Sequence, residues 1–353
     1  MIENYGYLPH MKPDDSKGTP ARVTAAHRER YELVCEHGEC FGKLKPSVYY
    51  ASGTEEFPTT GDFVLIDYNP LGDSPIIATL SRRSYFSRRA PGTIPKDQTV
   101  AANFDYVFIM QSLNQNFNLK RMERYLTLAW QSEALPVVIL TKADLTDDYF
   151  EQLRAAEKIA TGTGVFAVSA HTGYGLDMLD DYLRPRKTVV FLGSSGVGKS
   201  SLLNALAKRA GETDDVMAVK EIREEDARGR HTTTHRQLVM LKSGVMIIDT
   251  PGMRELGMWD VGAGLGEAFA DVEQYLGACK FSDCRHESEP GCAVNAAVEC
   301  GKLPRKRWES YLKLKREARY TDDKMGALRD KNKIDKDIAI FTKSLKNKKG
   351  AKR

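Results

Sequence analysis

Hydrophobic positions divide the chain into stretches with different patterns. Residues 1–19 are polar and contain Pro13 and Gly18, which predicts a flexible N-terminal tail. Over residues 20–84, short β-type runs alternate with turn residues, which is typical of a small β-barrel or, as the alternative, of a two-sheet sandwich. The strands predicted in this stretch are Tyr31–Cys35, Ser47–Tyr50, Asp62–Ile66 and Ile76–Leu80.

A different pattern runs through residues 85–258. From Asp105 onward, apolar strand runs alternate with amphipathic helices, which predicts an α/β domain with a mainly parallel sheet. After each run the chain turns polar or Gly-rich, and open α/β sheets bind ligands at these strand ends. The predicted strands are Tyr106–Met110, Val137–Leu140, Val165–Val168, Val189–Leu192 and Val245–Ile248. Beyond Trp259 no further strand is predicted.

Composition changes this picture mainly through charge. The 353 residues exceed the size of one hydrophobic core, so two or three domains are expected, and 41% hydrophobic with 28% charged residues is ordinary for a globular protein. The net charge is +4, but residues 302–353 contain 19 Lys and Arg against 7 Asp and Glu. The first 301 residues are therefore net −8, and a basic helical end with a tail over 321–353 follows an acidic body.

The N-terminal segment predicts a reducing compartment. The first residues show neither the basic start nor the apolar stretch of a secretory signal, and no apolar run reaches a membrane span of about 18 residues. We therefore expect a cytoplasmic protein with no membrane association. Its six cysteines are then free thiols or metal ligands rather than disulfides.

A phosphate-binding motif follows the strand predicted at Val189–Leu192. It has the pattern G-x4-G-K-S and opens a helical run. The loop amides and the helix N-terminus would face phosphates, Lys199 would neutralise the β and γ charges, and Ser200 would ligate Mg²⁺. The residues of this candidate nucleotide site are Gly193, Ser194, Ser195, Gly196, Val197, Gly198, Lys199, Ser200 and Ser201.

Two further segments select guanine over adenine. Thr141-Lys142-Ala-Asp144 is similar to the N-K-x-D clamp, whose Asp accepts both donors on the guanine edge, and Ser169-Ala170 is similar to the loop that reads guanine O6. A D-x-x-G motif, from Asp249 to Gly252, ends another predicted strand, where Asp249 would hold the magnesium through water and the Gly252 N–H would contact the γ-phosphate. Together these motifs predict a GTPase.

The order of the nucleotide motifs along the chain differs from that of Ras-like GTPases and matches that of a known family. Ras-like GTPases run P-loop, D-x-x-G, N-K-x-D, S-A, whereas this chain begins with the base clamp and ends with D-x-x-G, so the domain is circularly permuted. From about Arg22 to Tyr320 the chain resembles the ribosome small-subunit-dependent GTPase A (RsgA) family. Supporting segments are Gly61-Asp62, Asn103–Asp105, Arg124–Leu126, Gly229–Thr234, Asp249–Glu255 and the Cys/His cluster.

The resemblance implies a domain plan and a function. It implies an OB-fold barrel over residues 20–84, a permuted GTPase domain over 85–258 and an α-helical zinc domain over 259–320. It also implies a GTP hydrolase that binds the small (30S) ribosomal subunit and its 16S rRNA, is stimulated there and assists late subunit maturation. We expect a monomer. The alternatives are a P-loop ATPase or kinase, and an RNA-binding zinc protein with little catalysis.

Two positions depart from the usual pattern of GTPases. Thr141 stands where most members of the family have Asn, and because Thr lacks the amide we expect it to lose contacts with the base site and the P-loop and to lower nucleotide affinity. Met253 occupies the position where many GTPases have a water-orienting Gln. His231 is then the catalytic candidate, although a loop histidine without a catalytic part is the alternative. Thr234, or Thr233, would bind Mg²⁺ and the γ-phosphate.

The cysteine spacing predicts one structural zinc ion. Cys279, Cys284, His286 and Cys292 offer three thiolates and one imidazole within 14 residues, a closed tetrahedral set. The spacing matches the zinc site of the family. Cys300 is expected to be a packed thiol, with ligand exchange as the alternative, and Cys35 and Cys40 are expected to be barrel residues.

Basic segments are the candidates for RNA contact. Arg305–Trp308 and the stretch Lys313–Arg353 are helix-compatible and densely positive, which suits phosphate contacts with RNA, while a solvated helix face is the alternative and is favoured for residues 347–353. Arg82-Arg83 and Arg88-Arg89 flank the aromatic pair Tyr85 and Phe86, where either nucleic-acid binding or a solvated linker fits.

Overall fold

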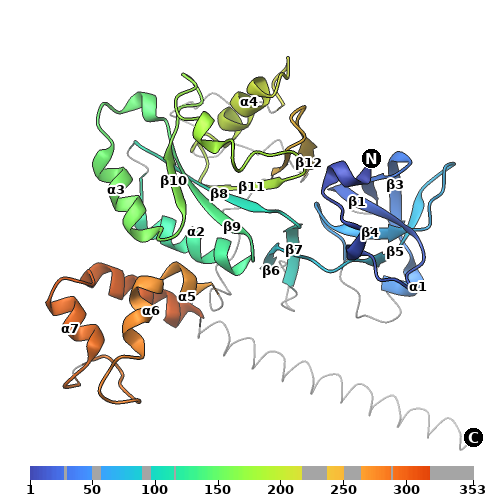
Figure 1. The fold of residues 1–353 in the computed structure, drawn as a ribbon. Helices are drawn as coiled ribbons and strands as arrows, with labels where there is room; N and C mark the ends of the chain where they lie inside the picture. The colour runs from blue at the N-terminus through green and yellow to red at the C-terminus, as the bar shows by residue number, and fades with distance from the viewer. Residues whose placement is uncertain are drawn as a thin grey trace, which may run out of the picture. The chain divides into compact units, whose positions relative to one another are not determined.

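The computed structural model describes residues 1–27, 30–49, 57–89, 97–114, 117–216, 237–249, 264–287 and 289–318. The chain forms two compact units, Met1–Gly257 and Met258–Arg353. Figure 1 shows strands in the first unit and helices alone in the described part of the second. None of the helices in these ranges combines the length and hydropathy needed to cross a bilayer. The finer division of the chain at residues 20, 85, 259 and 321 stays a prediction.

The N-terminal strands form a closed five-stranded barrel. In spatial order β1, β2, β3, β5 and β4 pair with their neighbours, and β4 pairs back onto β1. The prediction of a small OB-like barrel is therefore confirmed, because a sandwich would leave open edges. The strands are β1 (Thr19–Ala26), β2 (Tyr31–Cys35), β3 (Gly38–Leu44), β4 (Phe63–Ile66) and β5 (Ser74–Thr79).

One predicted barrel strand is wrong. Residues 46–49 form a helical turn, α1 (Pro46–Tyr49), instead of the strand expected at Ser47–Tyr50. The amides of Val48 and Tyr49 both donate to the carbonyl of Lys45, and the buried Tyr49 side chain packs into the barrel core with its hydroxyl 2.9 Å from Thr79 Oγ1. The apolar residues here belong to a helical turn that covers the barrel core. Alternation of apolar and polar residues along the chain does not distinguish this turn from a short strand.

The first 19 residues also differ from the expectation of a flexible tail. They contain two 3₁₀ turns, η1 (Ile2–Tyr5) and η2 (Pro9–Met11). Ile2 and Tyr7 are buried, and they pack with the barrel residues Phe63, Leu65 and Leu80. Two apolar side chains in a polar segment are enough to hold it against the barrel.

A two-stranded ribbon follows the barrel. Its strands are β6 (Tyr85–Arg89) and β7 (Asp97–Ala102). Arg82, just before it, makes a two-pronged contact with the carboxylate of Asp62 at 2.8 and 2.9 Å, and both side chains are buried. Phe86 is buried and stacks on Phe104. Of the basic and aromatic residues considered for nucleic-acid contact, Arg82 and Phe86 are therefore structural.

The expected α/β sheet is present. Its parallel part has the order β10-β9-β8-β11-β13, and β12 pairs antiparallel to β13. The strands are β8 (Tyr106–Ser112), β9 (Leu135–Thr141), β10 (Gly164–Ala167), β11 (Thr188–Gly193), β12 (Gln237–Met240) and β13 (Met246–Asp249). The sequence patterns gave no prediction of β12.

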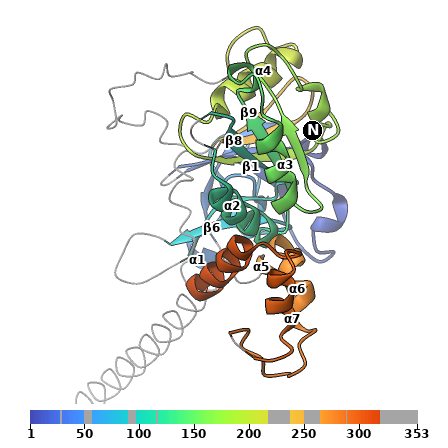
Figure 2. The same cartoon turned by 90° about the vertical axis from the view of Figure 1, so that its left-hand side faces the viewer.

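Helices cover both faces of this sheet. α4 (Lys199–Arg209) places Leu202, Leu203 and Leu206 in one core cluster with inward residues of β8, β9 and β11. α2 (Leu119–Gln131) packs on β8 and β9 and beside α3 (Phe150–Ile159), as Figures 1 and 2 show. Short 3₁₀ turns, η3 (Ala143–Leu145) and η4 (Asp177–Leu179), follow β9 and β10.

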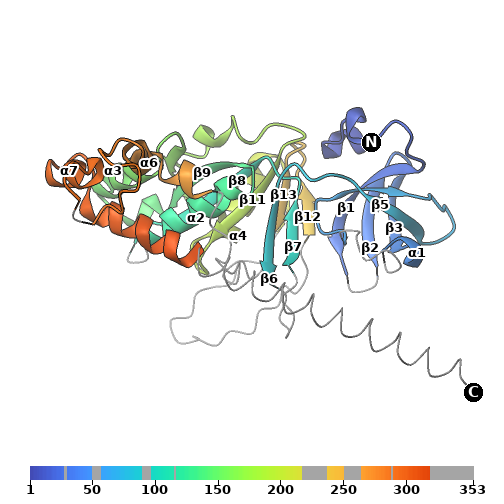
Figure 3. The same ribbon diagram turned by 90° about the horizontal axis from the view of Figure 1, so that it is seen from below.

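A buried arginine joins the barrel to this sheet. Figure 3 shows β12 beside barrel strand β1, where Gln237 pairs with Ala25. Arg22 of β1 is fully buried and donates to the carbonyls of Tyr5, Gly61 (3.2 Å) and Asn103 (2.8 Å). It also reaches Thr188 Oγ1 and Met246 Sδ, which lie at the starts of β11 and β13.

The second unit is a small helical unit around the cysteine cluster. It contains α5 (Leu265–Ala268), α6 (Ala270–Leu276) and α7 (Ala293–Glu299), and residues 305–318 are helical. Arg307 is buried, grips both carboxylate oxygens of Asp271 and lies over the Phe269 ring. Within the basic segment expected to contact RNA, Arg307 and the buried Trp308 are thus structural, while Arg305 and Lys306 are exposed.

Candidate functional site

The predicted nucleotide motifs meet at one edge of the parallel sheet. β9 ends at Thr141, β11 ends at Gly193 and β13 ends at Asp249, and β8 separates β9 from β11. Because the strands are parallel, these carboxyl ends lie along the same edge. The base clamp, the P-loop and the start of the D-x-x-G motif are therefore neighbours in space despite their permuted order.

The P-loop has the backbone that its sequence requires. A Cβ on Gly193 would lie 2.8 Å from the carbonyl oxygen of Met110, so no side chain fits there, and Gly198 has φ +100° where α4 begins. Lys199 Nζ donates to the carbonyls of Gly193 and Ser194 at 2.7 and 2.8 Å. This ammonium lies across the loop that carries it, and Ser200 and Ser201 follow in the first turn of α4.

Thr141 supplies a P-loop contact that we expected it to lose. Its side chain is buried, and its hydroxyl lies 2.6 Å from the carbonyl of Val197 and 3.3 Å from that of Gln111. The hydroxyl therefore ties the end of β9 to the second half of the P-loop. The expectation of a lost P-loop contact is wrong, while the expected effect on affinity stays a prediction.

The two loops predicted to read guanine are joined to each other. Lys142 adopts a left-handed backbone (φ 63°), which turns the chain so that the amide of Ala143 donates to Val168 O in the neighbouring loop. Asp144 is exposed at the edge of the sheet. Ser169 is buried, with Oγ accepting from the amides of His171 and Thr172, and Ala170 follows it. Asp144 and Ser169 thus lie on adjoining loops.

One residue near the phosphate site was not found by sequence motifs. Arg121, in the first turn of α2, places Nη1 3.3 Å from Ser194 Oγ of the P-loop. It belongs to no nucleotide motif, and 73 residues separate it from Ser194. The signal available in the sequence was Asn118, whose side chain caps α2 three residues earlier.

Several predicted site residues lie outside the described residues. These are His231, Thr233, Thr234, Gly252 and Met253. Asp249 ends β13 as expected, next to β11, but the structure describes only its backbone. The roles of these residues therefore stay predictions.

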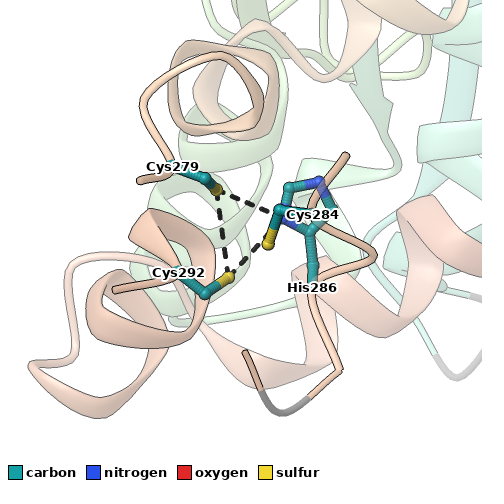
Figure 4. Close-up of side chains that lie close together, drawn as sticks. All are labelled: Cys279, Cys284, His286 and Cys292. Atoms are coloured by element: carbon teal, nitrogen blue, oxygen red, sulfur yellow. Dashed lines mark hydrogen bonds between the residues drawn. The ribbon is translucent and has the colours of Figure 1, made fainter. Parts of the chain in front are cut away.

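The second unit contains a cluster with the ligands expected for a metal. Figure 4 shows Cys279, Cys284, His286 and Cys292 gathered from separate turns of the chain. Their ligand atoms all lie within 4.8 Å of one another, with Cys279 Sγ 4.0 Å from Cys292 Sγ and 3.4 Å from His286 Nδ1. Thiolates about 2.3 Å from a tetrahedral zinc ion would stand about 3.8 Å apart, so the cluster fits one ion.

Packing around His286 supports the same role. Its backbone is left-handed (φ 62°), and its ring meets the Trp308 ring edge-on at 5.7 Å. Burial lowers the pKa of His286, with a further contribution from Lys315, which favours the neutral imidazole that ligates a metal. Cys300 is not part of the cluster, and its side chain is exposed rather than packed. Cys35 and Cys40 lie in β2 and β3, as expected.

A strand–P-loop–helix unit preceded in the chain by a base clamp defines a circularly permuted GTPase. The comparisons agree on this class. The structure of YjeQ from Thermotoga maritima aligns with a TM-score of 0.62 at 27% identity, covering 85% of this chain and 98% of that one. YloQ, titled a circularly permuted GTPase, aligns with a TM-score of 0.60 at 23% identity over 87% and 97%, which shows the fold.

The sequence comparisons are more specific. Residues 79–259 match the family described as RsgA GTPase. A curated relative from Listeria monocytogenes, "Small ribosomal subunit biogenesis GTPase RsgA 1", is 43% identical over 322 residues, covering 91% of this chain and 90% of the relative. A relative named RsgA 2 from Lactiplantibacillus plantarum is 44% identical over 300 residues, with coverage of 85% and 83%. The chain belongs to the RsgA GTPase family, and it is a GTPase.

Proposed function

We propose that this protein hydrolyses GTP to GDP and phosphate on the small (30S) ribosomal subunit and assists the late maturation of that subunit. The observation that carries the proposal is the 43% identity, over nine-tenths of both chains, to proteins named for small-subunit biogenesis. The built P-loop and the adjoining guanine-reading loops support the nucleotide part.

Each nucleotide motif has a proposed role. Asp144 reads the guanine edge from the clamp that also contains Lys142, and Ser169-Ala170 contacts guanine O6. Lys199 moves from its loop carbonyls to the β and γ phosphates, since phosphate oxygens are stronger acceptors than neutral carbonyls. Mg²⁺ bound with GTP would neutralise phosphate charge, and Ser200, Thr234 and Asp249 would hold it.

Hydrolysis needs a group that orients the attacking water. Met253 has no hydrogen-bonding atom suited to this, so we assign the role to His231 in the segment between the P-loop and D-x-x-G. Gly252 would contact the γ-phosphate through its N–H. Without a glutamine at position 253, the isolated protein is a slow GTPase and depends on the subunit for stimulation.

The second unit would be an RNA-binding element built on one structural zinc ion. Four protein ligands leave no open coordination position, so the metal would fix the fold rather than activate water. The exposed Arg305 and Lys306, together with the basic residues of the segment 319–346, would contact phosphates of 16S rRNA. Arg307 is excluded from that contact by its pairing with Asp271. We propose that the protein acts as a monomer in the cytoplasm.

The test is GTP hydrolysis by the full chain, with Mg²⁺, in the absence and presence of purified small subunits. We expect small subunits to stimulate turnover at least tenfold and purified large subunits to have no effect. A Lys199→Ala variant should show no stimulated turnover. Equal rates with and without small subunits would refute the proposal.

A further inference from the structure

Arg121 connects the P-loop to a helix that carries no nucleotide motif. Its Nη1 lies 3.3 Å from Ser194 Oγ, and its side chain is partly buried. Ser194 is also one of the two residues whose carbonyls accept from Lys199 Nζ. Two cations therefore meet at Ser194, Lys199 on the main chain and Arg121 on the side chain.

The start of α2 is fixed so that Arg121 points toward the loop. Gln111, at the end of β8, accepts a hydrogen bond from the amide of Asn118 through Oε1 (3.2 Å). The Asn118 side chain in turn accepts from the amide of Arg121 at 3.0 Å. β8 pairs directly with β11, the strand that enters the P-loop, through Met110 and Gly193. The position of Arg121 thus derives from the same sheet that positions the loop.

The P-loop is consequently held from outside in both halves. Thr141 binds the carbonyl of Val197 in the second half, and Arg121 binds the hydroxyl of Ser194 in the first half. A phosphate cradle works only if successive backbone N–H groups stay aimed at the ligand. Side chains that fix the loop from neighbouring elements reduce the reorganisation needed on binding.

We propose that Arg121 is a positioning residue of the phosphate site, which holds Ser194 and through it the first half of the P-loop in the shape that receives the phosphates. The inference rests on the proposed hydrolysis of GTP at this P-loop and names a residue of α2 on which it depends. A solvated helix cation would have no such effect, and a cation acting directly on phosphate would act without Ser194.

A double-mutant cycle separates these cases. The variants are Arg121→Met, which keeps much of the stem but removes charge and donors, Ser194→Ala, and the two combined. We expect each single change to lower kcat/KM for GTP about five- to tenfold, and the double variant to be no worse than the single ones. Arg121→Lys should recover part of the loss. Lys120→Met, which removes an exposed cation one residue away, should stay within twofold of wild type.

The same cycle is measured by equilibrium binding of a fluorescent GDP analogue, so that it does not depend on turnover, and urea unfolding verifies that each variant is folded. Wild-type binding and turnover in Arg121→Met would overturn the proposal. So would effects of Arg121→Met and Ser194→Ala that multiply in the double variant, since this would show that Arg121 acts without Ser194. If wild-type protein lacks GTPase activity even with small subunits, the proposed function fails instead.

Discussion

Strand β11 has cations at both ends, and the two ends differ in how that charge is held. At the amino ends, Arg22 contacts Thr188 and Met246, is fully buried and forms no ion pair with any described residue. At the carboxyl end of β11, Lys199 rests on two carbonyls of its own loop and Arg121 on a loop hydroxyl, all partly buried.

The difference lies in what surrounds each charge. Arg22 is enclosed by neutral acceptors from the N-terminal segment, the barrel and the sheet, and its guanidinium lies 4.8 Å from the Phe63 ring centre. Burial lowers its pKa to about 9, opposed by the charge of Asp105, so it stays protonated at neutral pH. Its bonds all serve the fold. At the P-loop end, Lys199 contacts loop carbonyls that a phosphate can replace, and Arg121 contacts a loop hydroxyl.

The largest effect on stability should come from Arg22, at the amino ends of β11 and β13. We expect Arg22→Met to lower the free energy of unfolding by about 3 kcal/mol or more, because it leaves the buried carbonyl of Asn103 without its donor and removes one of the two donors to the buried carbonyl of Gly61. Urea unfolding measures this. As a control, Arg30→Met removes a half-exposed barrel arginine paired with Asp73 and should cost no more than about 1 kcal/mol. Equal losses of unfolding free energy in Arg22→Met and Arg30→Met would show that the burial of Arg22 adds nothing to stability.

At the carboxyl end of β11, we expect substitution of Lys199 to weaken nucleotide binding and to leave stability nearly unchanged. Lys199→Ala should weaken GTP binding about 10- to 100-fold, the value of one or two charge-assisted hydrogen bonds to phosphate, with little change in the unfolding midpoint. Titration with a fluorescent GTP analogue measures it. Lys208→Ala, an exposed lysine of the same helix that pairs with Asp215, should bind like wild type. If Lys199→Ala lost as much stability as Arg22→Met, the two ends of β11 would not differ in the way proposed.

The smallest effect tests the neutral contact between clamp and loop. Thr141→Val keeps the shape but removes the donor to Val197 O, and should cost about 1 kcal/mol of stability and a few-fold in GTP affinity. Thr141→Ser should retain both, and Thr141→Asn should bind GTP more tightly than wild type. Denaturation and nucleotide titration on the same samples give the two values. Unchanged affinity in Thr141→Val would show that the contact does not shape the P-loop.

The features that the sequence predicts correctly are those built from residues close together in the chain. The P-loop, the clamp and the cysteine cluster are local patterns, because each needs a few residue types at fixed spacing, and the structure places the described members together. The prediction of a strand at Ser47–Tyr50 is wrong because the Tyr49 side chain fills the barrel core from a helical turn and does not belong to an alternating strand. The sequence predicts a flexible tail over residues 1–19 because Ile2 and Tyr7 are too few to form a hydrophobic pattern, but the structure packs both side chains on Phe63 and Leu65.

The sequence by itself determined the class of protein, the permuted order of its motifs and the ligand set of the second unit, since chemistry at fixed spacing is written along the chain. Only the tertiary structure decided what each arginine does. Arg22, Arg82 and Arg307 bind partners 17 or more residues away and are enclosed, whereas Arg121 reaches a loop 73 residues away. A charge acquires its role from the groups that the fold brings around it, and no local pattern records those groups.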